Sequence, residues 1–120
     1  MPDDPGPAAL ERLRALCLAQ PGATERVSHG EAAWFAAGAR GRQFAMFADR
    51  HHDDRVACWC AAPPGAQAPL VEAEPARYFR PPYVGHRGWV GAYLDIARVD
   101  WEHIEELIDA AHLTVAPPRR

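Results

Sequence analysis

One apolar stripe repeats at helical spacing near the start of the chain, and it comprises Leu10, Leu13, Leu16 and Cys17. Pro7 suits the first turn of such a helix, because the amide hydrogen that proline lacks is not needed there. Pro21 and Gly22 then interrupt the pattern. The spacing therefore predicts a helix over about residues 7–19, followed by a connector that extends to residue 31.

A second stripe near the end of the chain predicts the most regular element, and it comprises Trp101, Ile104, Leu107, Ile108 and Ala111. Asp100 precedes the stripe and is a good N-cap, because its carboxylate can accept a hydrogen bond from a free backbone amide. Acidic residues crowd the first turns, where the helix dipole favours them. We expect this helix to begin after Asp100 and to end before Pro117.

The middle of the chain predicts a sheet. The runs "AAWFAAG", "QFAMFAD" and "RVACWCAA" are short and apolar, and only "ARGR" and "RHHDD" separate them. Parallel strands need crossovers of about a dozen residues, so these strands form an antiparallel meander. A short helix over about residues 66–72, a brief edge segment at "PPYVG" and a last strand at "GWVGAYLD" follow. Gly91 in that last strand indicates a bulge or the close approach of another backbone.

Length and composition indicate one globular domain. The chain has 120 residues, of which 48% are hydrophobic and 24% charged. We expect an α+β fold over residues 1–120, in which the N- and C-terminal helices pack on the antiparallel sheet and residues 1–6 and 117–120 are flexible tails. No apolar run reaches the roughly 20 residues that cross a bilayer, and the first residues are acidic. The prediction is a cytoplasmic protein without membrane contact.

The sequence shows no convergent catalytic or metal-binding set. Ser28 is the only serine and directly precedes His29, and adjacent side chains rarely point at each other. The segment "DRHHDDR" holds two histidines and three carboxylates, but a hairpin tip spreads such side chains into solvent. Cys17, Cys58 and Cys60 include no CxxC pair, and the last two share one face of a strand as buried thiols. We expect no enzymatic activity, no metal and no cofactor.

Four arginines mark the two predicted hairpin tips, and they are Arg40, Arg42, Arg50 and Arg55. Paired basic hairpins could straddle a DNA backbone as wings, with the guanidinium groups contacting phosphates. The net charge of −3 and the acidic last helix oppose tight duplex binding, which depends on many phosphate contacts. The tips therefore form a candidate DNA-binding site, and solubilising turns are the alternative.

The segment "PPYVGHRGWVG", residues 81–91, suggests a second candidate site. Gly85 and Gly88 bracket a His-Arg dipeptide, which fits a tight hairpin turn before the strand. Its aromatic residues could simply anchor the core. Alternatively, a shallow pocket here binds a small anionic ligand or nucleotide, or a protein partner. The residues that would form this pocket are His29, Tyr83, His86, Arg87 and Trp89.

Four segments of the chain, taken in order, resemble one family of small bacterial proteins. They are "TERVSHGEAAWF", "FAMFADRHHDDRVACWCAAPPGAQ", "PARYFRPPYVGHRGWVGAYLDI" and "DWEHIEELIDAAHLTVAPPR". Together they are similar to the MmcQ/YjbR family. The resemblance implies a compact CyaY-like, or double-wing, α+β domain and a DNA-binding role. It implies no catalytic residues, and "GARGRQF" departs from the family's glycine-lysine turn by placing Arg42 at the basic position.

Overall fold

The computed structural model describes residues 4–38, 41–51 and 53–116. Arg40, His52 and the segments 1–3 and 117–120 lie outside the described residues. In chain order the described elements are α1 (Gly6–Leu18), β1 (Thr24–Ser28), β2 (Glu31–Phe35), β3 (Gln43–Asp49), β4 (Val56–Cys60), α2 (Gln67–Ala73), β5 (Tyr78–Phe79), the 3-10 turn η1 (Gly85–Arg87), β6 (Val90–Tyr93) and α3 (Trp101–Val115).

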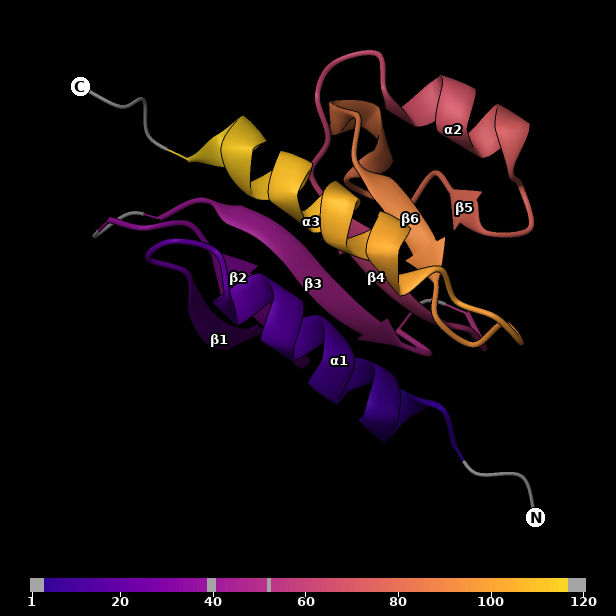
Figure 1. The fold of residues 1–120 in the computed structure, drawn as a ribbon, viewed down its shortest axis with the longest axis horizontal. Coiled ribbons are helices and arrows are strands. Elements are labelled where there is room, and N and C mark those ends of the chain that lie inside the picture. The colour runs from indigo at the N-terminus through magenta and orange to yellow at the C-terminus, as the bar shows by residue number, and fades with distance from the viewer. Residues whose placement is uncertain (1–3, 39–40, 52, 117–120) are drawn as a thin grey trace.

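These strands form one antiparallel sheet in the order β1-β2-β3-β4-β6-β5. Helices α1 and α3 lie on the same face of this sheet, which we call the inner face, and α2 lies beside β5 and β6 (Figure 1). The chain is thus an α+β domain with its N- and C-terminal helices packed on an antiparallel sheet, as the hydrophobic pattern predicts.

The core lies between the two terminal helices and the inner face. Both helices turn their apolar stripes toward it, with Leu13 of α1 and Ile108 of α3 buried and Leu10 and Leu107 half-buried against the core. All three cysteines are buried and free, which confirms the expectation of structural thiols. Burial also raises the pKa of the Cys17 thiol, so this group stays protonated.

The half-buried carboxylate of Glu25 joins α1 to the first two strands. Arg14 of α1 donates from Nε to Glu25 Oε1 at 2.8 Å and from Nη2 to Glu25 Oε2 at 3.0 Å. Trp34 of β2 donates from Nε1 to Glu25 Oε1 at 2.9 Å. The Arg14 hydrogen bonds lower the pKa of Glu25 against the opposing effect of burial. This three-residue contact places Trp34 on the inner face.

The predicted connector over residues 20–31 is wrong, because it contains strand β1. Ser28 pairs with Glu31, and His29 and Gly30 form the two-residue turn between them with φ values of 53° and 82°. Two successive positive φ angles are typical of the type I′ turns that link tight hairpins. The strand was missed because β1 is a polar edge strand, whose side chains are exposed or half-buried.

The segment after α2 also differs from the prediction. The short edge strand is Tyr78–Phe79, which pairs with β6, and residues 80–84 form no strand. The expected hairpin turn is the 3-10 turn η1, which ends at Gly88 in the left-handed conformation with φ 88°. At the N-terminal end of the described residues, α1 starts at Gly6 and Asp4 contacts Arg50.

Gly91 of β6 allows an aromatic ring to cross the strand. A Cβ atom at this position would lie 2.3 Å from Phe79 Cζ and 2.4 Å from Phe79 Cε2. The ring of Phe79 continues across β6 and stacks on Tyr93, with 4.5 Å between centroids. The close approach expected at Gly91 therefore involves a side chain rather than another backbone.

We predict that Gly91→Ala lowers the free energy of unfolding by about 2 kcal/mol, because the added methyl group overlaps the Phe79 ring. Urea denaturation measures this loss. In a Phe79→Ala background the same substitution should cost less than half as much, since the overlap is then removed. If Gly91→Ala lowers the free energy of unfolding equally in the two backgrounds, the overlap with the Phe79 ring is not the cause.

Candidate functional site

A cavity of about 620 Å³ lies against the outer face of the sheet, opposite α1 and α3. Its floor is formed by Met46 of β3 and Trp59 of β4, which are directly paired across the two strands. Trp89, just before β6, extends the floor, and both indoles are buried. The described residues that line the cavity are His29, Gln43, Met46, His51, Trp59, Tyr83, Val84, Arg87 and Trp89.

A β-bulge in β3 brings two of these residues to one face. Trp34 pairs with Ala45 but Phe35 pairs with Gln43, so Phe44 is an extra residue in β3. Phe44 packs edge-on against His112 of α3, with ring centroids 5.2 Å apart, and therefore faces inward together with Ala45. Gln43 is consequently turned to the outer face, where it lines the cavity with Met46.

The register of the strands gives the cavity two different ends. Gln43 starts β3 and Trp89 precedes β6, and both lie at the end of the sheet where Cys60 pairs with Val90. His29 and His51 lie at the opposite end, in the β1–β2 turn and the β3–β4 loop. About 20 Å of strand separates the two ends, since β3 rises about 3.3 Å per residue.

Residues 80–89 cover part of the outer face and supply four lining side chains. Gln67 at the start of α2 anchors this segment by donating from Nε2 to the carbonyl oxygens of Gly85 and Trp89, at 2.9 and 2.5 Å. Tyr83 has a φ of 66°, which is unusual for a bulky residue and holds its side chain at the rim of the cavity. Backbone strain of this kind is often found at binding sites.

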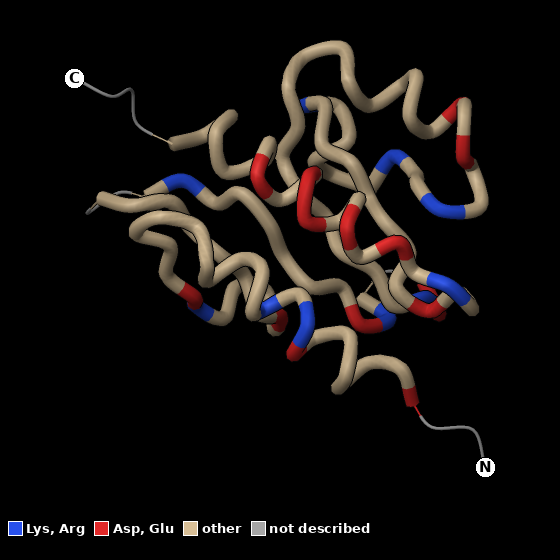
Figure 2. Tube along the Cα trace, in the orientation of Figure 1, with Lys and Arg blue, Asp and Glu red and all other residues tan. Residues whose placement is uncertain are grey.

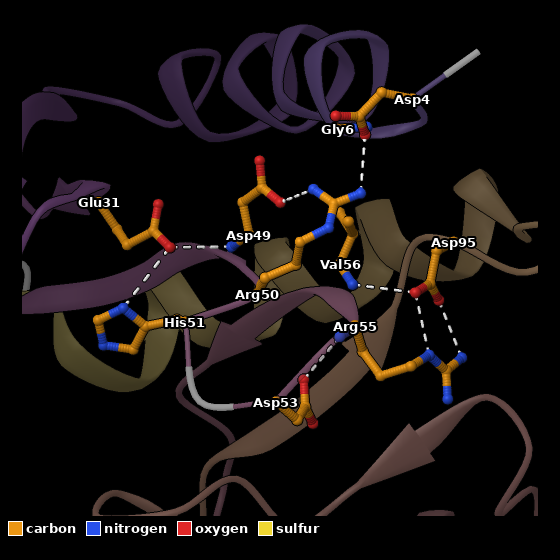
Figure 3. Close-up of polar contacts among 10 residues, drawn as sticks. All are labelled: Asp4, Gly6, Glu31, Asp49, Arg50, His51, Asp53, Arg55, Val56 and Asp95. Atoms are coloured by element: carbon orange, nitrogen blue, oxygen red, sulfur yellow. Dashed lines mark hydrogen bonds and ion pairs between the residues drawn. The ribbon is translucent and has the colours of Figure 1, made fainter.

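A carboxylate orients the histidine in the β3–β4 loop. Glu31 Oε2 lies 3.6 Å from His51 Nδ1 and also accepts the Asp49 amide hydrogen at 2.9 Å (Figure 3). Burial raises the pKa of Glu31, and the Asp49 amide and His51 partly oppose this effect. His51 packs edge-on against Trp59, with 5.8 Å between centroids, so its second nitrogen points away from Glu31.

The structure brings together four of the five residues predicted for a ligand pocket: His29, Tyr83, Arg87 and Trp89 all line the cavity. The fifth, His86, is exposed on η1 and does not line it. The sequence analysis missed five lining residues, namely Gln43, Met46, His51, Trp59 and Val84. His51 belongs to the segment "DRHHDDR", which was considered as a metal site. Only the fold shows that His51 lines the same end of the cavity as His29.

The two arginine-bearing hairpin tips lie at opposite ends of β3 (Figure 1). The β2–β3 loop carries Arg42, and Arg40 in the same loop lies outside the described residues. The β3–β4 loop carries Arg50 and Arg55. Eight residues of extended chain separate Arg42 from Arg50, which corresponds to about 25 Å. One phosphate group cannot contact both tips.

Ion pairs within the chain engage both arginines of the β3–β4 loop (Figure 3). Arg50 contacts Asp49 and donates from Nη2 to Asp4 Oδ1 at 3.0 Å. Arg55 forms a two-pronged pair with Asp95, in which Nε to Oδ2 and Nη2 to Oδ1 both measure 2.9 Å. The Arg55 guanidinium also lies over Tyr93, 3.8 Å from the ring centroid.

Arg42 is different, because it is exposed and forms no ion pair with the part of the chain that the structure describes. The arginines are scattered around the molecule, whereas the acidic residues of α3 follow one another along the helix (Figure 2).

Among the described residues, no cluster of three or more His, Cys, Asp or Glu could hold a metal ion. No described helix is long and apolar enough to cross a membrane.

This combination of fold and site defines a small α+β domain with a cavity on the open face of its sheet. The YjbR family model matches residues 18–114, and the chain belongs to this family. Protein DR2400 of Deinococcus radiodurans, whose crystal structure is described as carrying the DUF419 domain, has a similar fold. The TM-score is 0.73 at 21% identity, and the match covers 88% of this chain and 77% of DR2400. No curated protein matches the chain.

The Asp95 contacts generate a prediction about stability and pH. Burial would raise the pKa of Asp95, but hydrogen bonds from Arg55 and from the Val56 amide outweigh it, and the pKa is lowered. A lowered pKa means that the ionised carboxylate stabilises the fold above about pH 4 and that this contribution is lost as the pH falls further.

Asp95→Asn should lower the free energy of unfolding by about 1–2 kcal/mol at pH 7. At pH 3 the difference in stability between variant and wild type should narrow, because Asp95 of the unfolded wild-type chain then binds a proton and its ionised form contributes less to folding. Urea denaturation at both pH values measures this. The charge-matched control is Asp54→Asn, at an exposed residue of the neighbouring loop. A difference in the free energy of unfolding between Asp95→Asn and the wild type that is the same at both pH values would contradict the prediction.

Proposed function

We propose that this protein binds a small ligand in the outer-face cavity. The observation that supports this most is the convergence of side chains from four separate segments of the chain. The β1–β2 turn, the β3–β4 loop, the floor of the sheet and the segment 80–89 all contribute. A volume of about 620 Å³ is typical of sites for drug-sized ligands.

The chemistry of the lining also supports ligand binding. Two tryptophans, a methionine and a valine provide apolar area, and a few polar groups lie at the two ends. Mostly apolar walls with a small number of placed polar groups are the usual composition of small-molecule sites. Neither a nucleophile and base pair nor a metal cluster is present among the described residues that line the cavity.

Binding in this cavity predicts a pattern of shifts in the four indole N–H signals of the protein. Titration of labelled protein with nucleotides, sugar phosphates and organic acids should move the signals of Trp59 and Trp89, which line the cavity. The signal of Trp34 should stay fixed, because its indole is bonded to Glu25 on the inner face. Two-dimensional NMR measures this, and a panel in which no compound moves the Trp59 and Trp89 signals would refute the proposal.

DNA binding is the second candidate function, and the exposed Arg42 is the observation that favours it. Arg50 and Arg55 support it less, because a phosphate would have to compete with Asp4, Asp49 and Asp95 for their guanidinium groups. A basic β2–β3 loop can still contact a phosphate backbone without the second tip.

If this loop binds DNA, Arg40→Ala with Arg42→Ala should weaken duplex binding and reduce its salt slope by about two. Fluorescence anisotropy at several salt concentrations measures both quantities. Arg12→Ala with Arg98→Ala removes the same charge elsewhere and serves as the control. Equal effects of the two double variants would argue against a role for this loop.

A further inference from the structure

We infer that the ligand of the outer-face cavity is a planar aromatic anion, whose ring lies against Trp59 and Met46 and whose carboxylate or phosphate pairs with Arg87. This inference rests on the proposed function and specifies the chemical class of the ligand. It is carried by three features of the cavity, namely its flat aromatic surfaces, its single fixed charge and its size.

The apolar surface of the cavity is suited to a flat ring. Trp59 and Trp89 are only 5% and 4% exposed, so their positions are fixed by packing rather than by a ligand. Tyr83 lies at the rim with 72% exposure and adds a third aromatic side chain. Aromatic rings prefer stacked or edge-on contacts with other rings, and the Met46 thioether also packs well on a ring.

Among the described residues that line the cavity, Arg87 alone carries a fixed charge. It forms no ion pair with the described residues, and its guanidinium lies 5.7 Å from the Trp89 ring centroid. A guanidinium at the edge of an aromatic floor can pair with a carboxylate or phosphate on a ring that lies on that floor. Gln43 at the same end of the cavity adds an amide that can donate a hydrogen bond.

The size and the opposite end of the cavity limit the ligand further. A cavity of about 620 Å³ is too large for a free phosphate ion and fits a molecule of one or two rings. His29 and His51 at the far end offer hydrogen bonds but no cluster of carboxylates that would repel an anion. Glu31 behind His51 is held by the Asp49 amide.

The test compares probes that differ in one property. The planar anion 2-naphthoate should bind at least about tenfold more tightly than the neutral 2-naphthylmethanol, since one charged hydrogen bond is worth about a factor of ten. It should also bind more tightly than cyclohexanecarboxylate, which keeps the charge but has no aromatic ring to stack. The affinities of adenosine monophosphate and adenosine are compared in the same way, to test whether a phosphate can take the place of the carboxylate. The readout is the NMR shift of the Trp59 and Trp89 indole signals.

Arg87→Gln should weaken 2-naphthoate binding about tenfold and change 2-naphthylmethanol binding less than about twofold. Arg98→Gln is the matched control, because it removes one exposed charge from a residue that does not line the cavity. An unchanged Trp34 indole signal verifies that each variant is folded. Loss of binding in Arg87→Gln that is absent from Arg98→Gln supports the assignment of the anion to Arg87.

Two results would overturn the inference while leaving the proposed function intact. One is equal binding of the neutral and anionic naphthalenes, and the other is a response to non-aromatic compounds alone. If no compound of any class moves the Trp59 and Trp89 signals, the proposed function itself fails.

Discussion

The β-bulge at Phe44 is the constraint on which both faces of the sheet depend. Without the extra residue, strict alternation would place Gln43 and Ala45 on one face and Phe44 and Met46 on the other. The bulge lets Phe44 pack under α3 beside His112, while Met46 remains on the outer face opposite Trp59. One inserted residue therefore completes the core and, at the same time, turns Gln43 toward the cavity.

The cavity persists because the two faces of the sheet are covered differently. Two amphipathic helices cover the inner face and fill it with side chains. Residues 80–89 cover only part of the outer face, and their side chains line the cavity instead of filling it. Gln67 and the left-handed conformations of Tyr83 and Gly88 hold this segment in place. Residues 80–89 are therefore held in place but leave room between themselves and Trp59.

Helical periodicity carried enough information to predict α1 and α3, because each helix has a single buried stripe and Asp100 caps α3 as expected. The strands were harder to interpret. All five residues of β4 are buried, so alternation cannot distinguish the face of Cys58 from the face of Trp59. The polar β1 is recognisable only by its turn. The position of Gln43 in the cavity lining depends on a bulge that has no sequence signature of its own.

The arginines of the β3–β4 loop make contacts that their positions in the sequence do not indicate. In sequence, Arg50 and Arg55 are a basic pair at a hairpin tip, but in the fold they link that tip to Asp4 before α1 and to Asp95 after β6. Their contacts join segments that are distant in the chain. A phosphate bound there would replace existing charged hydrogen bonds and gain little. Arg87 faces no such competitor among the described residues, so a ligand anion in the cavity gains the whole interaction.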